Sequence, residues 1–168
     1  MEQQSQLNFV RQQGFGEASA GECGFQYSSL MWQPRVTAVL VAVGLIWQIA
    51  PLFLAMSAVL WWNVAFPRLN LFDAAYNLFV ASPPARPRLT PARAPRRFSQ
   101  GMAASFMLGI GTSLLMGWTV AAYVFEAFLV VALLALILGK FCLGSYIFYL
   151  VTGQARYANQ TVPWARPR

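Results

Sequence analysis

Two long stretches of this sequence contain almost no charge, and they limit the folds open to the chain more than any other feature. Residues 36–66 contain no Lys, Arg, Asp or Glu, and residues 101–153 contain only Glu126 and Lys140. Uncharged apolar runs of about 18 residues or more are typical of membrane-spanning helices. Charged residues make up only 10% of the chain, against about a quarter in soluble domains. The sequence therefore predicts an integral membrane protein.

The fold class that we predict is an all-α membrane protein whose four transmembrane helices form two hairpins. Proline is tolerated in the first turn of a helix and resisted in its interior, so Pro51 predicts a tight turn over residues 48–51. One long kinked helix is the alternative. The last helix would exceed the thickness of a bilayer, so we expect it to tilt or to kink near Gly139 and Lys140. The predicted spans are 36–49, 52–66, 100–117 and 119–140.

Polar segments flank and separate these spans. Residues 70–81 predict an amphipathic helix on the membrane surface, with Asn70 as its cap and Asp73 in its first turn. Residues 82–98 are rich in proline and arginine and predict an extended basic loop. Residues 1–33 form a polar, glycine-interrupted tail, for which we expect irregular backbone, either disordered or laid on a partner. Residues 154–168 form a C-terminal tail.

Positive charge is concentrated in the central loop and in the C-terminal tail, while the two predicted short turns carry none. By the positive-inside rule, this distribution predicts that both termini are cytoplasmic in a bacterial inner membrane. The net charge of +7 is therefore interpreted as a topology signal, and we expect no nucleic-acid partner. The arginines predicted to contact lipid headgroups or a partner are Arg86, Arg88, Arg93, Arg96 and Arg97.

The chain has no histidine, which removes the most common metal ligand, general base and axial haem ligand. Its two cysteines, Cys23 and Cys142, lie far apart and do not indicate a disulfide framework. We find no recognisable catalytic constellation. The sequence predicts neither an enzyme nor a bound cofactor.

Small residues recur every four positions along the third predicted span, at Gly101, Ser105, Gly109, Ser113 and Gly117. Positions i and i+4 share one face of a helix, and small side chains there let another helix approach closely. This seam predicts helix packing, either inside the bundle or against another protein.

Two side chains in the apolar regions are candidate functional groups. Glu126 is the only acid inside a predicted span, and an intramembrane carboxylate suggests proton transfer or a cationic partner. Cys142 follows Lys140 in the sequence Phe141-Cys142-Leu143-Gly144-Ser145, and a thiolate is a nucleophile. The structural alternatives are a neutral acid bonded within the bundle and a cysteine that packs as a small apolar residue.

Several short motifs in order resemble an uncharacterised bacterial membrane family, domain of unknown function 4395, over about residues 34–153. They are Pro34-Arg35-Val36, Arg86-Pro87-Arg88-Leu89, Pro95 to Gln100, and Gly139 to Gly144 with Tyr146 and Tyr149. The resemblance implies a four-span protein of the cytoplasmic membrane and a Cys-x-x-Cys pair at positions 142 and 145, which points to thiol redox or sulfur handling. This chain has Ser145 at the second position, so exchange between two of its own thiols there is not available.

Three functions follow as hypotheses. The first is a non-catalytic accessory subunit of a larger bacterial membrane complex, respiratory or photosynthetic, with membrane lipids and other membrane subunits as its partners. The second is a membrane thiol or sulfur-handling protein that uses Cys142. The third is a small proton-linked carrier that uses Glu126.

Overall fold

The computed structural model describes residues 2–15, 23–81 and 89–165, and within these ranges the chain forms helices and turns without a β-strand. The prediction of an all-helical fold is confirmed for this part of the chain. The helices are α1 (Glu2–Gln12), α2 (Cys23–Leu30), α3 (Trp32–Trp47), α4 (Ala50–Ala65), the 3-10 turn η1 (Pro67–Leu69), α5 (Leu71–Phe79), α6 (Ala94–Leu115), α7 (Thr119–Ile137), α8 (Leu143–Val151) and α9 (Ala155–Gln160).

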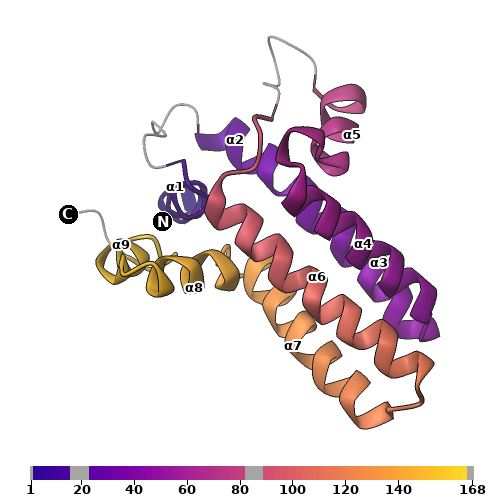
Figure 1. The fold of residues 1–168 in the computed structure, drawn as a ribbon. Coiled ribbons are helices and arrows are strands. Elements are labelled where there is room, and N and C mark those ends of the chain that lie inside the picture. Colours follow the sequence, from indigo (N-terminus) through magenta and orange to yellow (C-terminus); the bar gives the residue numbers. More distant parts are fainter. Residues whose placement is uncertain (1, 16–22, 82–88, 166–168) are drawn as a thin grey trace.

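Two helical hairpins, α3/α4 and α6/α7, lie side by side with their turns at the same end of the molecule (Figure 1). The first turn forms because Gln48 adopts a left-handed backbone (φ 49°) and Ile49 N–H donates to Gly44 O at 3.1 Å. The second uses Gly117 (φ 71°), and Trp118 N–H donates to Ser113 O at 2.8 Å. Both are left-handed helix ends closed by a backbone bond to the last turn. Residues 36–66 therefore form two helices, not one kinked helix.

Helix α6 occupies the middle of the bundle and packs on both α4 and α7. The buried core between these helices consists of Val41, Phe53, Met56, Leu60, Ala104, Met107, Ile110 and Leu129. Gly111 allows the closest approach, because a Cβ atom there would lie 2.7 Å from the Leu54 side chain. Close approach of this kind is how small residues bring helices together.

The remaining helices gather at the end of the bundle opposite the two turns (Figure 1). A second buried cluster forms there from α1, α2 and the segment before α8, and it contains Phe9, Val10, Tyr27, Leu30, Met31 and Cys142. The prediction of irregular backbone over residues 1–33 is wrong for α1 and α2. Phe9 and Val10 are buried against the other helices at this end, and this tertiary contact stabilises a helix that its glycine-rich neighbourhood does not suggest.

Each predicted element differs from its observed helix at one end or both, and the predicted spans 36–49 and 52–66 correspond to α3 (Trp32–Trp47) and α4 (Ala50–Ala65). Helix α6 begins at Ala94 with Pro95 in its first turn, so the last residues of the predicted basic loop 82–98 are helical. The surface helix runs from Leu71 to Phe79. Helix α7 ends at Ile137, and the chain turns at Lys140 (φ 51°) before α8 begins. The C-terminal tail contains α9.

Two helical stretches in the described residues are long and apolar enough to cross a membrane, Gln26–Trp47 and Thr119–Ile137. Ala50–Ala65 is apolar but shorter. Large apolar side chains on α7 point outward, and Val120, Phe128 and Val131 are each more than half exposed. An exposed apolar face of this kind needs an apolar environment or a partner to cover it.

Candidate functional site

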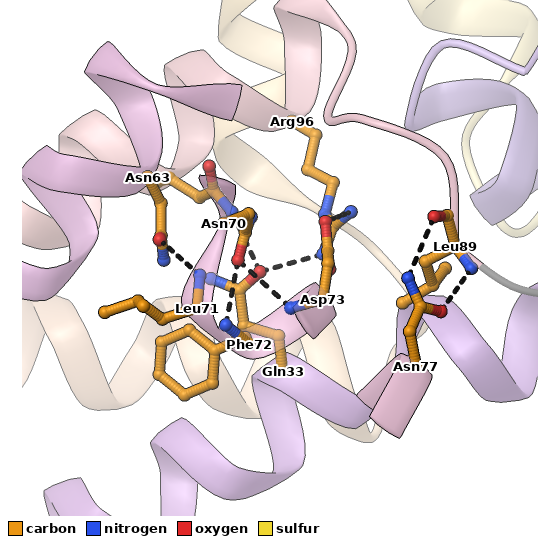
Figure 2. A network of polar contacts seen from close by, with 10 residues as sticks. Gln33, Asn63, Asn70, Leu71, Phe72, Asp73, Asn77, Leu89 and Arg96 are labelled. Carbon is orange, nitrogen blue, oxygen red and sulfur yellow. Dashed lines mark hydrogen bonds and ion pairs between the residues drawn. The ribbon is translucent and has the colours of Figure 1, made fainter. Parts of the chain in front are cut away.

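A buried ion pair joins α5 to the start of α6 (Figure 2). The Arg96 guanidinium donates to both carboxylate oxygens of Asp73, from Nη1 to Oδ2 at 3.0 Å and from Nη2 to Oδ1. Nη2 also donates to Gln33 Oε1 at 2.9 Å, and Gln100 Nε2 donates to the same oxygen at 2.8 Å. Two-pronged pairing of this kind is the strong form of an arginine–carboxylate contact. The network links α3, α5 and α6 through side chains that are all buried.

Helix α5 is held at this place by asparagine side chains (Figure 2). Asn70 Oδ1 accepts from Phe72 N–H at 3.0 Å and from Asp73 N–H at 3.2 Å, as its predicted capping role requires. Asn63 Oδ1 accepts from Leu71 N–H at 3.0 Å, which ties the first turn of α5 to α4. The start of α5, which carries Asp73, is therefore fixed by hydrogen bonds to two asparagine side chains.

Cys142 lies at the N-terminus of α8 between two serine hydroxyls. Its Sγ donates to Ser99 Oγ at 3.3 Å, and Ser145 Oγ donates to Sγ at 3.3 Å. The two hydroxyl oxygens are themselves 3.0 Å apart. Cys142 N–H donates to Gln12 Oε1 at 2.8 Å. The thiol is thus surrounded by polar groups from α1, α6 and α8.

A close contact between two helices creates this arrangement. Gly144 lies against α6, and a Cβ atom at this position would be 2.8 Å from both Cα and Oγ of Ser99. Since glycine has no side chain, α8 approaches α6 closely enough for Ser145 to reach Ser99. The left-handed turn at Lys140 directs the chain from α7 into this contact.

The thiol forms part of the wall of a cavity of about 90 Å³, which we name the Cys142 cavity. Its walls are mainly apolar, and its polar lining comes from α3, α6, the turn after α1 and the segment before α8. The lining residues are Phe9, Gln13, Leu30, Gln33, Pro34, Thr37, Leu60, Arg96, Ser99, Gln100, Ala103, Leu133, Leu136 and Cys142. The cavity therefore connects the buried ion-pair network with the thiol, two features that lie far apart in the sequence.

Helix α1 closes one side of this site. Phe9 and Gln13 line the cavity, Gln13 Nε2 donates to Ser145 Oγ at 3.4 Å, and Gln12 has no exposed surface. Tyr157 OH on α9 donates to Arg11 O at 3.1 Å, and Asn8 Nδ2 donates to Val162 O at 2.9 Å. The N-terminal segment is thus fixed between the site and the C-terminal helices.

The predicted headgroup arginines have different environments. Arg96 is buried in the ion pair, so its predicted contact with lipid or a partner is wrong. Arg93 Nη1 donates to Gly14 O at 2.9 Å, and its guanidinium covers the Phe15 ring. Arg97 donates to Val64 O through Nε and Nη2 at 3.0 and 2.7 Å. Arg86 and Arg88 lie outside the described residues.

The predicted seam contributes to packing within the bundle at several of its positions. Gly101 faces the Trp61 and Val64 side chains of α4, Gly109 lies against the Phe125 ring of α7, and Ser113 is buried. Ser105 and Gly117 are exposed.

Glu126 is buried beside Gln48 at the turn end of the bundle, and its Oε1 has no hydrogen-bond partner among the described residues. It lies apart from the Cys142 cavity, which it does not line. The structure therefore does not bring the two candidate functional groups together.

Sequence reasoning missed most of the residues around Cys142, namely Gln12, Gln13, Gln33, Thr37, Ser99 and Gln100. The signal that could have revealed some of them is the polar side chain in an apolar helix, because buried amides need partners. Gln33 begins an apolar run and Gln100 opens another. The contribution of α1 has no comparable signal, because it depends on tertiary contacts.

A family model described as Domain of unknown function (DUF4395) matches residues 29–152. The matched region contains α3 to α8, the buried ion pair and Cys142, whereas α1, Gln12 and Gln13 precede it. No curated protein and no solved structure matches the chain.

Proposed function

The chain belongs to the DUF4395 family, and on that premise we propose that it is a multi-pass membrane protein that handles sulfur through a single thiol, Cys142. The four helices of the two hairpins cross the bilayer, and the end that carries the Cys142 cavity faces the cytoplasm. The observation on which the proposal rests is the position of Cys142 Sγ, on a cavity wall and 3.3 Å from each of two hydroxyls.

The distribution of apolar and charged residues supports the membrane part of this proposal. The turns at Gln48–Ile49 and Gly117–Trp118 carry no charge, whereas Arg35, Arg93 and Arg156 belong to the opposite end. Trp47 and Trp118 lie exposed at the turn end, and Trp61 and Trp62 lie partly exposed toward the other end of α4. Tryptophans at both ends and arginines at one end are typical of a bundle with a cytoplasmic side.

The chemistry of one thiol differs from that of a pair. When Cys142 attacks a disulfide R–S–S–R′, the new bond joins Cys142 Sγ to the sulfur of R, and the bond to R′ breaks. The thiol proton leaves with R′ as R′–SH, so no oxidant is consumed. The Ser145 hydroxyl, which donates to Cys142 Sγ at 3.3 Å, can donate to the thiolate while it forms. Because position 145 is serine, the mixed disulfide persists until a thiol from elsewhere than position 145 releases it.

Mass spectrometry of the intact protein tests this role. We would use Cys23→Ser protein in mild detergent, so that Cys142 is the only thiol, and expose the folded protein to a small methanethiosulfonate. We expect complete modification, reversal by dithiothreitol and no modification of a Cys142→Ser control. If Cys142 reacts only after denaturation, the thiol is merely a packed core residue and the proposal is wrong.

The accessory-subunit and Glu126 carrier functions stay predictions. In the structure α1 and α9 pack against their own chain, so these terminal helices do not by themselves indicate a partner. Extraction in mild detergent and a native gel separate the cases, since an accessory subunit would migrate with a stoichiometric partner.

A further inference from the structure

Two polar atoms in the Cys142 cavity have no hydrogen-bond partner among the described residues. They are Thr37 Oγ1 and Gln100 Oε1, and both side chains line the cavity. Thr37 is 6% exposed and Gln100 is 5% exposed, so bulk water does not satisfy them. A buried polar atom without a partner costs about 1–3 kcal/mol. Two of them on one cavity point to a ligand that supplies the missing bonds.

The neighbouring ion pair determines which hydrogen-bonding role Gln100 offers. An arginine side chain only donates, so the atom of Gln33 that receives Arg96 Nη2 must be the amide oxygen Oε1. The group of Gln100 that contacts the same oxygen must then be its NH₂, Nε2. The oxygen of Gln100 is left over. The cavity therefore presents an acceptor whose identity does not depend on an arbitrary amide orientation.

Thr37 carries the one hydroxyl among the described residues that is buried without a hydrogen-bond partner. Helical serines and threonines commonly donate to the carbonyl four residues earlier. In this chain Ser99, Ser105, Thr112 and Thr152 all do so, with distances of 2.8 to 2.9 Å. Thr37 has the same opportunity inside α3 and makes no such bond. Its hydroxyl is available to a molecule in the cavity.

Charge and size limit what that molecule can be. Arg96 is the only charged residue among those that line the cavity, and Asp73 neutralises it through two bonds. An anion would therefore lose its hydration without meeting a free positive charge. A volume of about 90 Å³ has room for only a small group, so the part of the molecule that enters the cavity is small and uncharged.

We propose that the Cys142 cavity is a binding site for a small uncharged sulfur compound that carries a hydroxyl or amide donor, held by Thr37 Oγ1 and Gln100 Oε1. This inference rests on the proposed function, and it names the substrate class of the same thiol. The compound is a small disulfide or thiosulfonate, whose sulfur Cys142 attacks with loss of the other half as described above.

Three methanethiosulfonates that differ only in the transferred group R test the proposal on Cys23→Ser protein. Each transfers its S–R group to the thiol and releases methanesulfinate, with R as methyl, 2-hydroxyethyl or 2-sulfonatoethyl. For each reagent, the rate with folded protein is divided by the rate with denatured protein. This ratio removes differences in the intrinsic reactivity of the three reagents. One added hydrogen bond of about 0.5–1.5 kcal/mol corresponds to roughly 2- to 12-fold, so we expect the hydroxyethyl reagent to react that much faster than the methyl reagent. We expect the sulfonate to react most slowly.

Thr37→Val is the diagnostic variant, because it removes only a hydroxyl that the fold does not use and keeps the shape of the side chain. It should reduce the hydroxyethyl rate relative to the methyl rate, because one of the two hydrogen bonds to the reagent's hydroxyl is lost. Ser57→Ala is the matched control, since Ser57 Oγ donates to Ala104 O at 2.8 Å and does not line the cavity. It should change neither normalised rate.

The outcomes separate the two proposals. If the methyl reagent modifies folded protein but the hydroxyethyl preference is absent, or is undiminished in Thr37→Val, the substrate class is wrong and water alone occupies the cavity. The single-thiol function would still stand. If no reagent modifies Cys142 in the folded protein, the function itself is wrong.

Discussion

Asp73 and Arg96 meet in a part of the molecule that excludes water, and this makes their charges costly to separate. Both side chains are less than a tenth exposed. Removing one member of a buried pair leaves an uncompensated charge, whereas removing both does not. The pair therefore determines where α5 lies on α6 more than it adds to stability.

Asp73→Ala should lower the free energy of unfolding by about 3–5 kcal/mol, because it leaves Arg96 buried without a counter-charge. The double variant Asp73→Ala with Arg96→Met should lose less than the single variant. Unfolding of the purified protein in mixed micelles measures both values. A loss of about 1 kcal/mol or less for Asp73→Ala, as for an exposed pair, would show that the charges are solvated and not buried.

At the scale of elements, the contact between α8 and α6 shapes the site. Gly144→Ala would place a methyl group against the α6 backbone at Ser99, and backbone atoms cannot move aside as a flexible side chain can. We expect a loss of about 1–3 kcal/mol in stability from this overpacking. The reaction of Cys142 with methanethiosulfonates should also change, since the shift separates α8 from Ser99.

Gly101→Ala is the control for this change. A Cβ atom at Gly101 would lie 3.9 Å from Trp61 and Val64, which is ordinary van der Waals contact. It should leave stability unchanged or slightly raised, because alanine favours the helix. If Gly101→Ala loses as much stability as Gly144→Ala, the loss does not come from the close approach of a Cβ atom to Ser99, and the packing explanation is wrong.

The helices that could be predicted from the sequence are those whose ends are marked by local chemistry. Pro51 and Gly117 predicted both turns, and Asn70 with Asp73 predicted the start of α5 to within a residue. Helix α1 could not be predicted, because its stability depends on burial of Phe9 and Val10 against parts of the chain far away. Propensity describes local preference, and tertiary packing can override it.

The candidate site could be predicted only in part for the same reason. Cys142 is visible in the sequence because the resemblance marks positions 142 and 145. Its neighbours Ser99 and Gln12 lie 43 and 130 residues away along the chain, so only the folded bundle brings them to the thiol. Arg96 was misassigned because a basic run resembles a headgroup site whether or not one member turns inward to a carboxylate.

At the scale of the whole molecule, the arrangement of the hairpins predicts which parts of the chain share a side of the membrane. The turns at Gln48 and Gly117 lie at one end, and α1, α5, α8 and α9 lie at the other (Figure 1). If the four helices of the hairpins cross the bilayer as we propose, both termini lie on one side. The arginines at the α1 and α9 end predict that this side is the cytoplasm.

Single cysteines introduced into a variant without Cys23 and Cys142 measure this topology. Gln48→Cys and Gly117→Cys should react in intact cells with a maleimide that cannot cross the membrane, whereas Arg156→Cys should react only after the cells are opened. Labelling of Arg156→Cys in intact cells together with protection of both turns would invert the orientation and leave the four crossings intact. Labelling of only one of the two turns would mean that one hairpin does not cross. In that case the exposed apolar face of α7 would have to be covered by another protein, and this would support the accessory-subunit prediction.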